Sequence, residues 1–207
     1  MRILFLGDIV RRAARQAVIE QMPDLRAELG CAFVIVNCEN AAGGYGVTPA
    51  ICEDLFACGI DVLTTGNHVF DKAEISLYLA SQDKLLRPDN MADGLPGKGH
   101  VIVQNEQGLR LGVVNLMANL FMAENANAFA AADKIKASMT LGGMLTPWWW
   151  IFMARPHLRK WQWGFILTGM RHWSSARTLI YQQQIAGFWM EEQLIRQMPA
   201  CAGITTL

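Results

Sequence analysis

Polar residues follow three apolar, strand-like runs of the chain, and their types suit metal and phosphate chemistry. These residues are Asp8 after the first run, Glu39 and Asn40 after the second, and Asn67 and His68 after the third. If the runs form consecutive parallel strands, the polar side chains meet where those strands end, at one edge of a sheet. Carboxylate, amide and imidazole groups bind divalent ions, and two ions about 3.5–4 Å apart can clamp a phosphate and activate a water. The pattern therefore predicts a dinuclear site for phosphate chemistry.

Each polar cluster alone also has an ordinary structural interpretation. Asp8 could cap a helix, the Glu39–Asn40 pair could form a turn, and Asn67 and His68 could simply bond to each other. The joint arrangement after three strands favours the metal site. His68 need not be a ligand, because an imidazole titrates near neutrality and could instead protonate a leaving alkoxide.

The elements that must position these residues can be predicted from hydrophobic spacing and from turn residues. The expected strands cover residues 2–7, 33–37, 60–65, 100–104 and 111–116, the last two as a hairpin. The expected helices cover residues 11–29, with Pro23 as a kink or break, 49–58 after Thr48 as cap, and 71–80 after Asp71 as cap. Alternation of strands and helices predicts a doubly wound or layered α/β sheet.

Composition excludes several classes of protein. The 207 residues allow one sizeable core, and 18 basic against 18 acidic residues give no overall field for nucleic acid or anionic membrane. The five cysteines show no CxxC pair, which indicates free thiols in a reducing compartment. Residues 1–6 run directly into the first strand without a basic, cleavable leader, so we expect a cytoplasmic protein.

The chain changes character near residue 148. All seven tryptophans lie at or beyond this point, whereas Glu191 and Glu192 are the only acidic residues there. Mixed Trp, Arg and Lys residues could contact a membrane interface or a nucleic acid, but no apolar run reaches the roughly 18 residues of a spanning helix. We expect no membrane association.

Four motifs make the resemblance to a known family specific. They are Leu6-Gly7-Asp8-Ile9-Val10, Asn37-Cys38-Glu39-Asn40-Ala41-Ala42-Gly43-Gly44, Thr65-Gly66-Asn67-His68-Val69-Phe70-Asp71-Lys72 and Leu86-Arg87-Pro88. From residue 1 to about 141 the chain resembles the YmdB-type, calcineurin-like metallophosphoesterases. The resemblance implies a layered calcineurin-like sheet with flanking helices and a cyclic-nucleotide phosphodiesterase acting on 2′,3′- or 3′,5′-cyclic nucleotides.

The resemblance also implies roles for individual residues. Asp8, Glu39, Asn40 and Asn67 match residues that bind two metal ions, divalent or mixed-valence and usually iron or manganese, and His68 matches the proton donor. The chain departs from the family at Arg11, where a glycine is usual. It also lacks the later histidines of the family, which lie in an Asp-Phe-His and a Thr-His-Thr-His motif. Of its own later histidines, His100 is expected to be structural, and His157 and His172 lie in no ligand pattern.

Both missing motifs can be recovered by reading the tail in another frame. Tryptophan has one codon, so Trp148-Trp149-Trp150 forces Val-Val when the third base of each codon is read with the next two. The codons of residues 150–153 then force Asp, permit Phe and permit only His or Tyr. Residues 174–181 can yield Val-Gly-Thr-His-Thr-His-Ile with favourable synonymous codons. We interpret residues 142–207 as an out-of-frame tail, with the break near residues 141–144.

The sequence thus predicts the N-terminal part of a metallophosphoesterase domain over residues 1–141 and a tail of uncertain fold, truncated or non-native, over residues 142–207. We expect a phosphodiester substrate and impaired activity, and the sequence leaves homo-oligomerisation open. The alternative is a non-catalytic α/β fragment that binds nucleotides or a partner.

Overall fold

The computed structural model describes residues 2–117, 126–140, 148–154, 162–168 and 202–206 of the chain. The strands are β1 (Arg2–Asp8), β2 (Phe33–Asn37), β3 (Val62–Thr64), β4 (Leu85–Leu86), β5 (His100–Gln104), β6 (Arg110–Met117), β7 (Trp148–Ala154), β8 (Gln162–Thr168) and β9 (Ala202–Thr206). The helices are α1 (Arg11–Leu29), α2 (Pro49–Ala57), α3 (Ile75–Ser81) and α4 (Ala128–Thr140).

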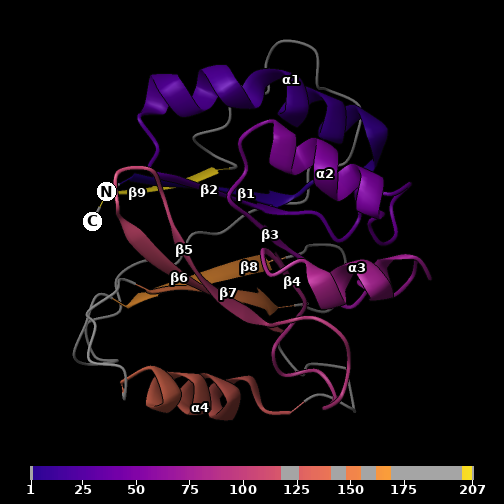
Figure 1. Ribbon diagram of the computed structural model, residues 1–207, viewed down its shortest axis with the longest axis vertical. Coiled ribbons are helices and arrows are strands. Elements are labelled where there is room, and N and C mark those ends of the chain that lie inside the picture. Colours follow the sequence, from indigo (N-terminus) through magenta and orange to yellow (C-terminus); the bar gives the residue numbers. More distant parts are fainter. Residues whose placement is uncertain (1, 118–125, 141–147, 155–161, 169–201, 207) are drawn as a thin grey trace.

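These elements form two sheets with helices outside them (Figure 1). The first sheet has the order β4-β3-β2-β1-β9, and the second has the order β5-β6-β7-β8. Strands β1 to β4 are mutually parallel, while β9 runs antiparallel to β1. Helices α1 and α2 lie over the outer face of the first sheet, and α4 lies beyond the second sheet (Figure 1). The predicted layered α/β fold is confirmed.

Side chains that alternate along the strands build the layers, because successive residues of a strand point to opposite faces. In β1, Leu4 and Leu6 join the core beneath the helices, whereas Ile3 and Phe5 join the core between the sheets. Strand β6 divides in the same way. Its Val113 packs between the sheets, and its Val114 packs against α4. Both central strands are therefore buried on both faces, as their continuous apolar runs predict.

Buried amides fasten the second sheet to the edge of the first where the polar clusters lie. The Nδ2 of Asn115 in β6 donates to the carbonyl oxygens of Thr65, at 2.8 Å, and Leu86, at 3.1 Å. The Nδ2 of Asn90 donates to the Met117 carbonyl at 2.6 Å. Each bond pairs a buried polar group, so the carboxyl ends of β3, β4 and β6 are held together.

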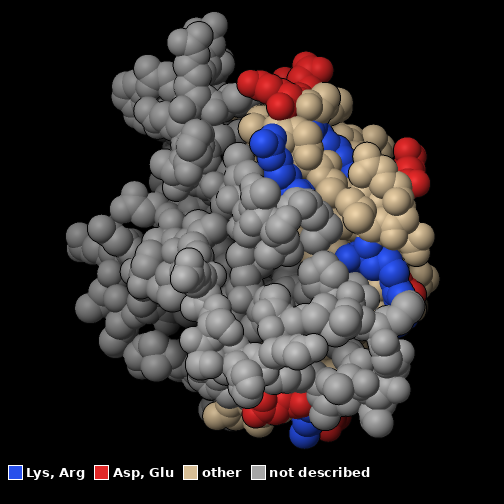
Figure 2. Space-filling view, turned by 90° about the vertical axis from the view of Figure 1, so that its left-hand side faces the viewer, with Lys and Arg blue, Asp and Glu red and all other residues tan. Residues whose placement is uncertain are grey.

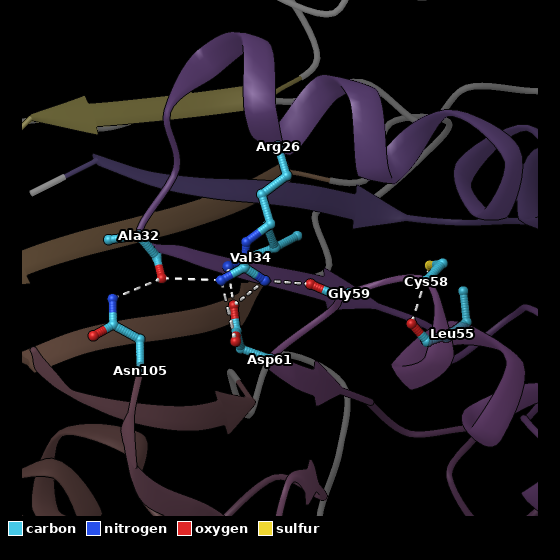
Figure 3. A network of polar contacts seen from close by, with 8 residues as sticks. All are labelled: Arg26, Ala32, Val34, Leu55, Cys58, Gly59, Asp61 and Asn105. Atoms are coloured by element: carbon cyan, nitrogen blue, oxygen red, sulfur yellow. Dashed lines mark hydrogen bonds and ion pairs between the residues drawn. The ribbon is translucent and has the colours of Figure 1, made fainter. Parts of the chain in front are cut away.

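At the opposite end of the strands, Arg26 of α1 forms a polar network with the first sheet (Figure 3). Its guanidinium donates to the carbonyl oxygens of Gly59 and Ala32 and lies 3.0 Å from Asp61 Oδ2. That same Asp61 oxygen accepts a 2.7 Å bond from the Val34 backbone N–H. Burial raises the pKa of Asp61 despite these contacts. The network fixes α1 against β2 and the start of β3.

Most predicted elements occur at or near their expected bounds, and the exceptions have local causes. Helix α1 is one continuous helix that contains Pro23, rather than two helices. Thr48 caps α2 through a 3.3 Å bond from the Ile51 backbone N–H, as predicted. The predicted cap at Asp71 is wrong, because α3 begins at Ile75 and the Asp71 carboxylate instead contacts His68 at 2.6 Å.

On the described part of the face in Figure 2, basic and acidic side chains are interspersed. This agrees with the balanced formal charge of the whole chain. Among the helices within the described ranges, none combines the length and apolar character that crossing a bilayer requires.

Candidate metal and phosphate site

The parallel register brings the first two polar clusters to one edge of the first sheet. Asp8 pairs with Asn37 at the ends of β1 and β2, and Asn37 pairs with Thr64 at the end of β3. Glu39 and Asn40 come directly after β2. The predicted convergence at the carboxyl ends of these strands is therefore observed in the backbone.

Asp8 and Asn40 are in direct contact. The Asn40 Nδ2 donates to Asp8 Oδ2 at 2.6 Å, and both side chains are buried. The other carboxylate oxygen, Oδ1, is buried and accepts no hydrogen bond from the described residues. Burial raises the pKa of Asp8 to about 6, although the Asn40 bond and the charge of His68 both lower it. A buried carboxylate with one oxygen left over is suited to a cation.

Glu39 places a second carboxylate in the same region. Its side chain is fully buried, and its backbone N–H donates to Asn37 Oδ1 at 3.3 Å. The neighbouring Cys38 thiol lies within electrostatic reach of both carboxylates. Its pKa is raised chiefly by burial, then by Cys52, and further by Glu39 and Asp8. Two acidic groups buried close together repel each other unless positive charge lies between them.

The third cluster carries the imidazole. Asn67 and His68 lie half-buried in the turn after β3. His68 Nδ1 lies 2.6 Å from Asp71 Oδ2, and the Tyr45 ring stands edge-on to the imidazole, with centroids 5.3 Å apart at 74°. The charge of His68 lowers the pKa of Asp8, so the imidazole acts electrostatically on the first cluster.

Sequence reasoning missed the partners of His68. The predicted helix cap at Asp71 does not account for this contact, although a spacing of three residues from His68 in a turn permits it. The contact of Tyr45 was not predicted either. It could have been suspected, because Tyr45 is an aromatic residue in a glycine-rich loop that follows a candidate ligand. His100, expected to be structural, bonds through Nδ1 to Asp89 Oδ1 at 2.9 Å. His157 and His172 lie outside the described residues.

Arg11 has an unusual backbone that explains why a glycine is favoured at this position. Its φ is 66°, and it is the one non-glycine residue with positive φ in the described part of the chain. Its backbone N–H donates to the Asn40 carbonyl at 3.2 Å, which fixes the turn between β1 and α1 against the second cluster. A side chain in this left-handed conformation costs roughly 1–2 kcal/mol, and glycine avoids that cost.

The ligand set on these strands is incomplete for two ions. Within the described ranges, no three His, Cys, Asp or Glu side chains gather into a group that could hold a metal. What the edge provides is a pair of carboxylates, Asp8 and Glu39, with two amides. Oxygen donors of this kind fit a hard divalent ion, but a dinuclear centre needs further ligands.

Comparisons with known proteins place this chain in a family. The model of the YmdB-like protein family matches residues 4–144. A 2′,3′-cyclic-nucleotide 2′-phosphodiesterase of Bacillus subtilis is 40% identical over 137 residues, which cover 66% of this chain and 52% of the relative. A putative phosphatase/phosphodiesterase of Mycoplasma genitalium is 30% identical over 56% of this chain and 43% of the relative. The chain thus spans about half the length of these relatives.

Two solved structures share the architecture. A hypothetical protein of Thermus thermophilus superposes with a TM-score of 0.60 at 34% identity, covering 65% of this chain and 52% of the other. A phosphatase of Mycoplasma pneumoniae superposes with a TM-score of 0.64 at 23% identity, covering 75% and 56%. The expected layered α/β fold with flanking helices is confirmed. Through residues 4–144, the chain belongs to the YmdB-like protein family.

Proposed function

We propose that this fold serves a metal-dependent phosphodiesterase acting on 2′,3′- or 3′,5′-cyclic nucleotides, and that this chain carries only part of the metal cage. The observation that carries the proposal is the pair of buried carboxylates, Asp8 and Glu39, at the carboxyl edge of a parallel sheet. Asp8 Oδ1 accepts no hydrogen bond within the described part of the chain, which makes a cation its natural partner. The Bacillus relative, a 2′,3′-cyclic-nucleotide 2′-phosphodiesterase, supports the substrate class.

Four residues would hold the ions: Asp8, Glu39, Asn40 and Asn67. The Asn40 amide nitrogen donates to Asp8, which leaves its carbonyl oxygen as the donor atom for a metal. Two divalent or mixed-valence ions, iron or manganese, would supply Lewis acidity and an activated water. Burial raises the pKa of Asp8 to about 6, so below that pH a metal must compete with a proton for this carboxylate.

His68 would act as general acid toward the leaving oxygen. Its Nδ1–H donates to the Asp71 carboxylate, so Nε2 is the ring nitrogen that can carry a transferable proton. Protonation of the alkoxide as the phosphorus–oxygen bond breaks prevents the build-up of a strongly basic leaving group.

The proposal includes an out-of-frame origin for residues 142–207. The family match stops at residue 144, within the interval where the frame is expected to break. Strand β7, whose codons can yield Val-Val-Asp-Phe-His in the other frame, pairs in parallel with β6. Its Ile151 lies beside Asn115, whose amide is bonded at the end of β3. A carboxylate and an imidazole encoded there would therefore come from the strand next to β6, which supports the hypothesis.

A non-catalytic α/β fragment that binds nucleotides or a partner is the second candidate. The incomplete ligand set in the described residues favours it for this particular polypeptide. The two candidates differ in what they require of Asp8 and Glu39, because a binding fragment needs no bound ion.

Metal content and hydrolysis of bis-p-nitrophenyl phosphate separate these candidates. After loading with Mn²⁺ and gel filtration, we expect the 207-residue chain to retain less than two ions and to turn over weakly or not at all. Asp8→Asn should abolish the residual metal binding, whereas Asp54→Asn, which changes an exposed carboxylate on α2, should leave it unchanged. Mn²⁺ binding that is unchanged in Asp8→Asn would favour the non-catalytic fragment. Two tightly held ions with full turnover would overturn the partial cage.

A further inference from the structure

We propose that Tyr45 is a specificity-determining residue that stacks on the nucleobase of the substrate, an inference that rests on the proposed function. Tyr45 lies edge-on to His68, the candidate proton donor, with ring centroids 5.3 Å apart. Yet 62% of Tyr45 is exposed, so the ring is available to a ligand. The other large exposed apolar side chains in the described part of the chain, Leu77, Ile102 and Leu109, are aliphatic.

The loop that carries Tyr45 is built to hold the ring in this place. Gly44 and Gly46 on either side have φ values of 103° and 73°, which glycine adopts without steric cost. A Cβ on Gly46 would come within 3.1 Å of Lys72 Cγ and 3.2 Å of the His68 carbonyl oxygen. The loop backbone therefore packs directly on the turn that contains His68.

Hydrogen bonds fix the same loop to the candidate ligands. The Gly44 N–H donates to the Asn40 carbonyl at 3.1 Å, and the Ala42 N–H donates to the Gly46 carbonyl at 2.9 Å. Arg15 of α1 donates to the Ala41 carbonyl at 2.8 Å. Tyr45 is thus pre-positioned by backbone contacts, and a ligand that stacks on it need not order the loop first.

The position of the ring defines what it can recognise. In the proposed function His68 protonates the leaving oxygen of a bound phosphodiester, so the attached nucleoside would lie beside the imidazole. An exposed aromatic ring beside that path offers a π-face to any base, since stacking tolerates all four bases. We therefore expect Tyr45 to distinguish nucleotides from base-free phosphates while leaving the choice among bases open.

The test compares two ligands on the full 207-residue chain, with and without Mn²⁺. Dissociation constants are measured by titration calorimetry for adenosine 3′-monophosphate and for inorganic phosphate. Stacking predicts that the wild-type chain binds the nucleotide more tightly than phosphate. Tyr45→Leu should weaken nucleotide binding by about 5- to 150-fold and leave phosphate binding unchanged, whereas Tyr45→Phe should retain the preference.

Ile102→Ala, which alters an exposed apolar side chain on β5, is the matched control and should bind both ligands like the wild type. An unchanged nucleotide preference in Tyr45→Leu would overturn the role of Tyr45. A wild-type chain that binds the nucleotide no better than phosphate would overturn it too. A wild-type chain that binds neither Mn²⁺ nor phosphate, by contrast, would count against the proposed function. Circular dichroism verifies that each variant folds.

Discussion

The two parts of the chain on either side of residue 141 differ in composition and in how their strands relate to polar residues. Before it, apolar runs end at polar clusters, glycines mark turns, and acids and bases are evenly distributed. After it, acids almost vanish, all seven tryptophans gather, and yet strands β7, β8 and β9 extend the two sheets. Local sequence, burial and predicted chemistry agree in the first part. In the second part the chain forms strands, but these strands carry no candidate catalytic or metal-binding residues.

This contrast shows what strand formation alone can and cannot indicate. A run such as residues 148–153 is aromatic and apolar, and such residues favour strands whatever reading frame produced them. Polar residues at strand ends are more informative, because burial penalises them unless they are paired or bind something. Asp8 and Glu39 meet that criterion, and residues 142–207 offer no acidic residue before Glu191.

Restoring the other reading frame after residue 141 should produce the largest change. The restored product would carry the Asp-Phe-His and Thr-His-Thr-His motifs, and we expect two ions per chain. Loss of a partner that merely orients a metal ligand costs 10- to 100-fold in affinity or activity, so recovered ligands should raise phosphodiester turnover by at least about 100-fold. Metal analysis and hydrolysis of 2′,3′-cyclic nucleotides measure this. A restored product as inactive as the present chain would contradict the claim that the other frame encodes the missing metal ligands.

Packing should differ as sharply between the two parts. Phe5 is fully buried between the sheets, so Phe5→Ala should lower the free energy of unfolding by about 3–5 kcal/mol. If the tail is out of frame, Trp173→Ala should change it by less than about 0.5 kcal/mol, because such a residue would not have been selected to pack. Urea denaturation gives both values. A cost for Trp173→Ala near that of Phe5→Ala would show a selected core in the tail.

The core was predictable because it rests on continuous apolar runs and on clear turn and cap residues. The runs that became β1 and β2 were visible as uninterrupted apolar segments, and Thr48 with Pro49 marked the start of α2. The two-residue β4 has no periodicity to detect. In the site, Asp8 and Asn40 were predicted to be neighbours, but the Asp71 and Tyr45 contacts with His68 depend on how loops fold back, which spacing alone does not determine.

Burial of Asp8 predicts a pH-dependent cost in the metal-free chain. Its folded pKa of about 6 exceeds the ordinary value of 3.8, so the unfolded chain ionises first as pH rises. Stability is therefore lost between about pH 4 and pH 6, by about 3 kcal/mol in all. Asp8→Asn should be more stable than wild type by up to this amount at pH 7 and equal at about pH 3. Thermal denaturation in EDTA across this range measures the difference, and equal stability at neutral pH would refute the burial cost.

The smallest expected effect is on stability, at Arg11, which lies in the part of the chain before residue 141. Arg11→Gly relieves the positive φ of 66° but adds flexibility to the unfolded chain, so we expect a net stabilisation of about 0.5–1 kcal/mol. Arg12→Gly, one residue further into the same helix, should instead destabilise by about 1 kcal/mol. Chemical denaturation of the pair distinguishes them, and the same sign for both would contradict the conformational argument.

The most direct test of the central claim is the DNA sequence across codons 138–148 and onward through the tail. We predict an insertion or deletion near codons 141–144, after which the alternative frame reads Asp-Phe-His at the codons of residues 150–153. The same frame should then read Thr-His-Thr-His at the codons of residues 176–180. Synonymous codons that instead produce other residues or a stop in that frame would contradict the out-of-frame origin.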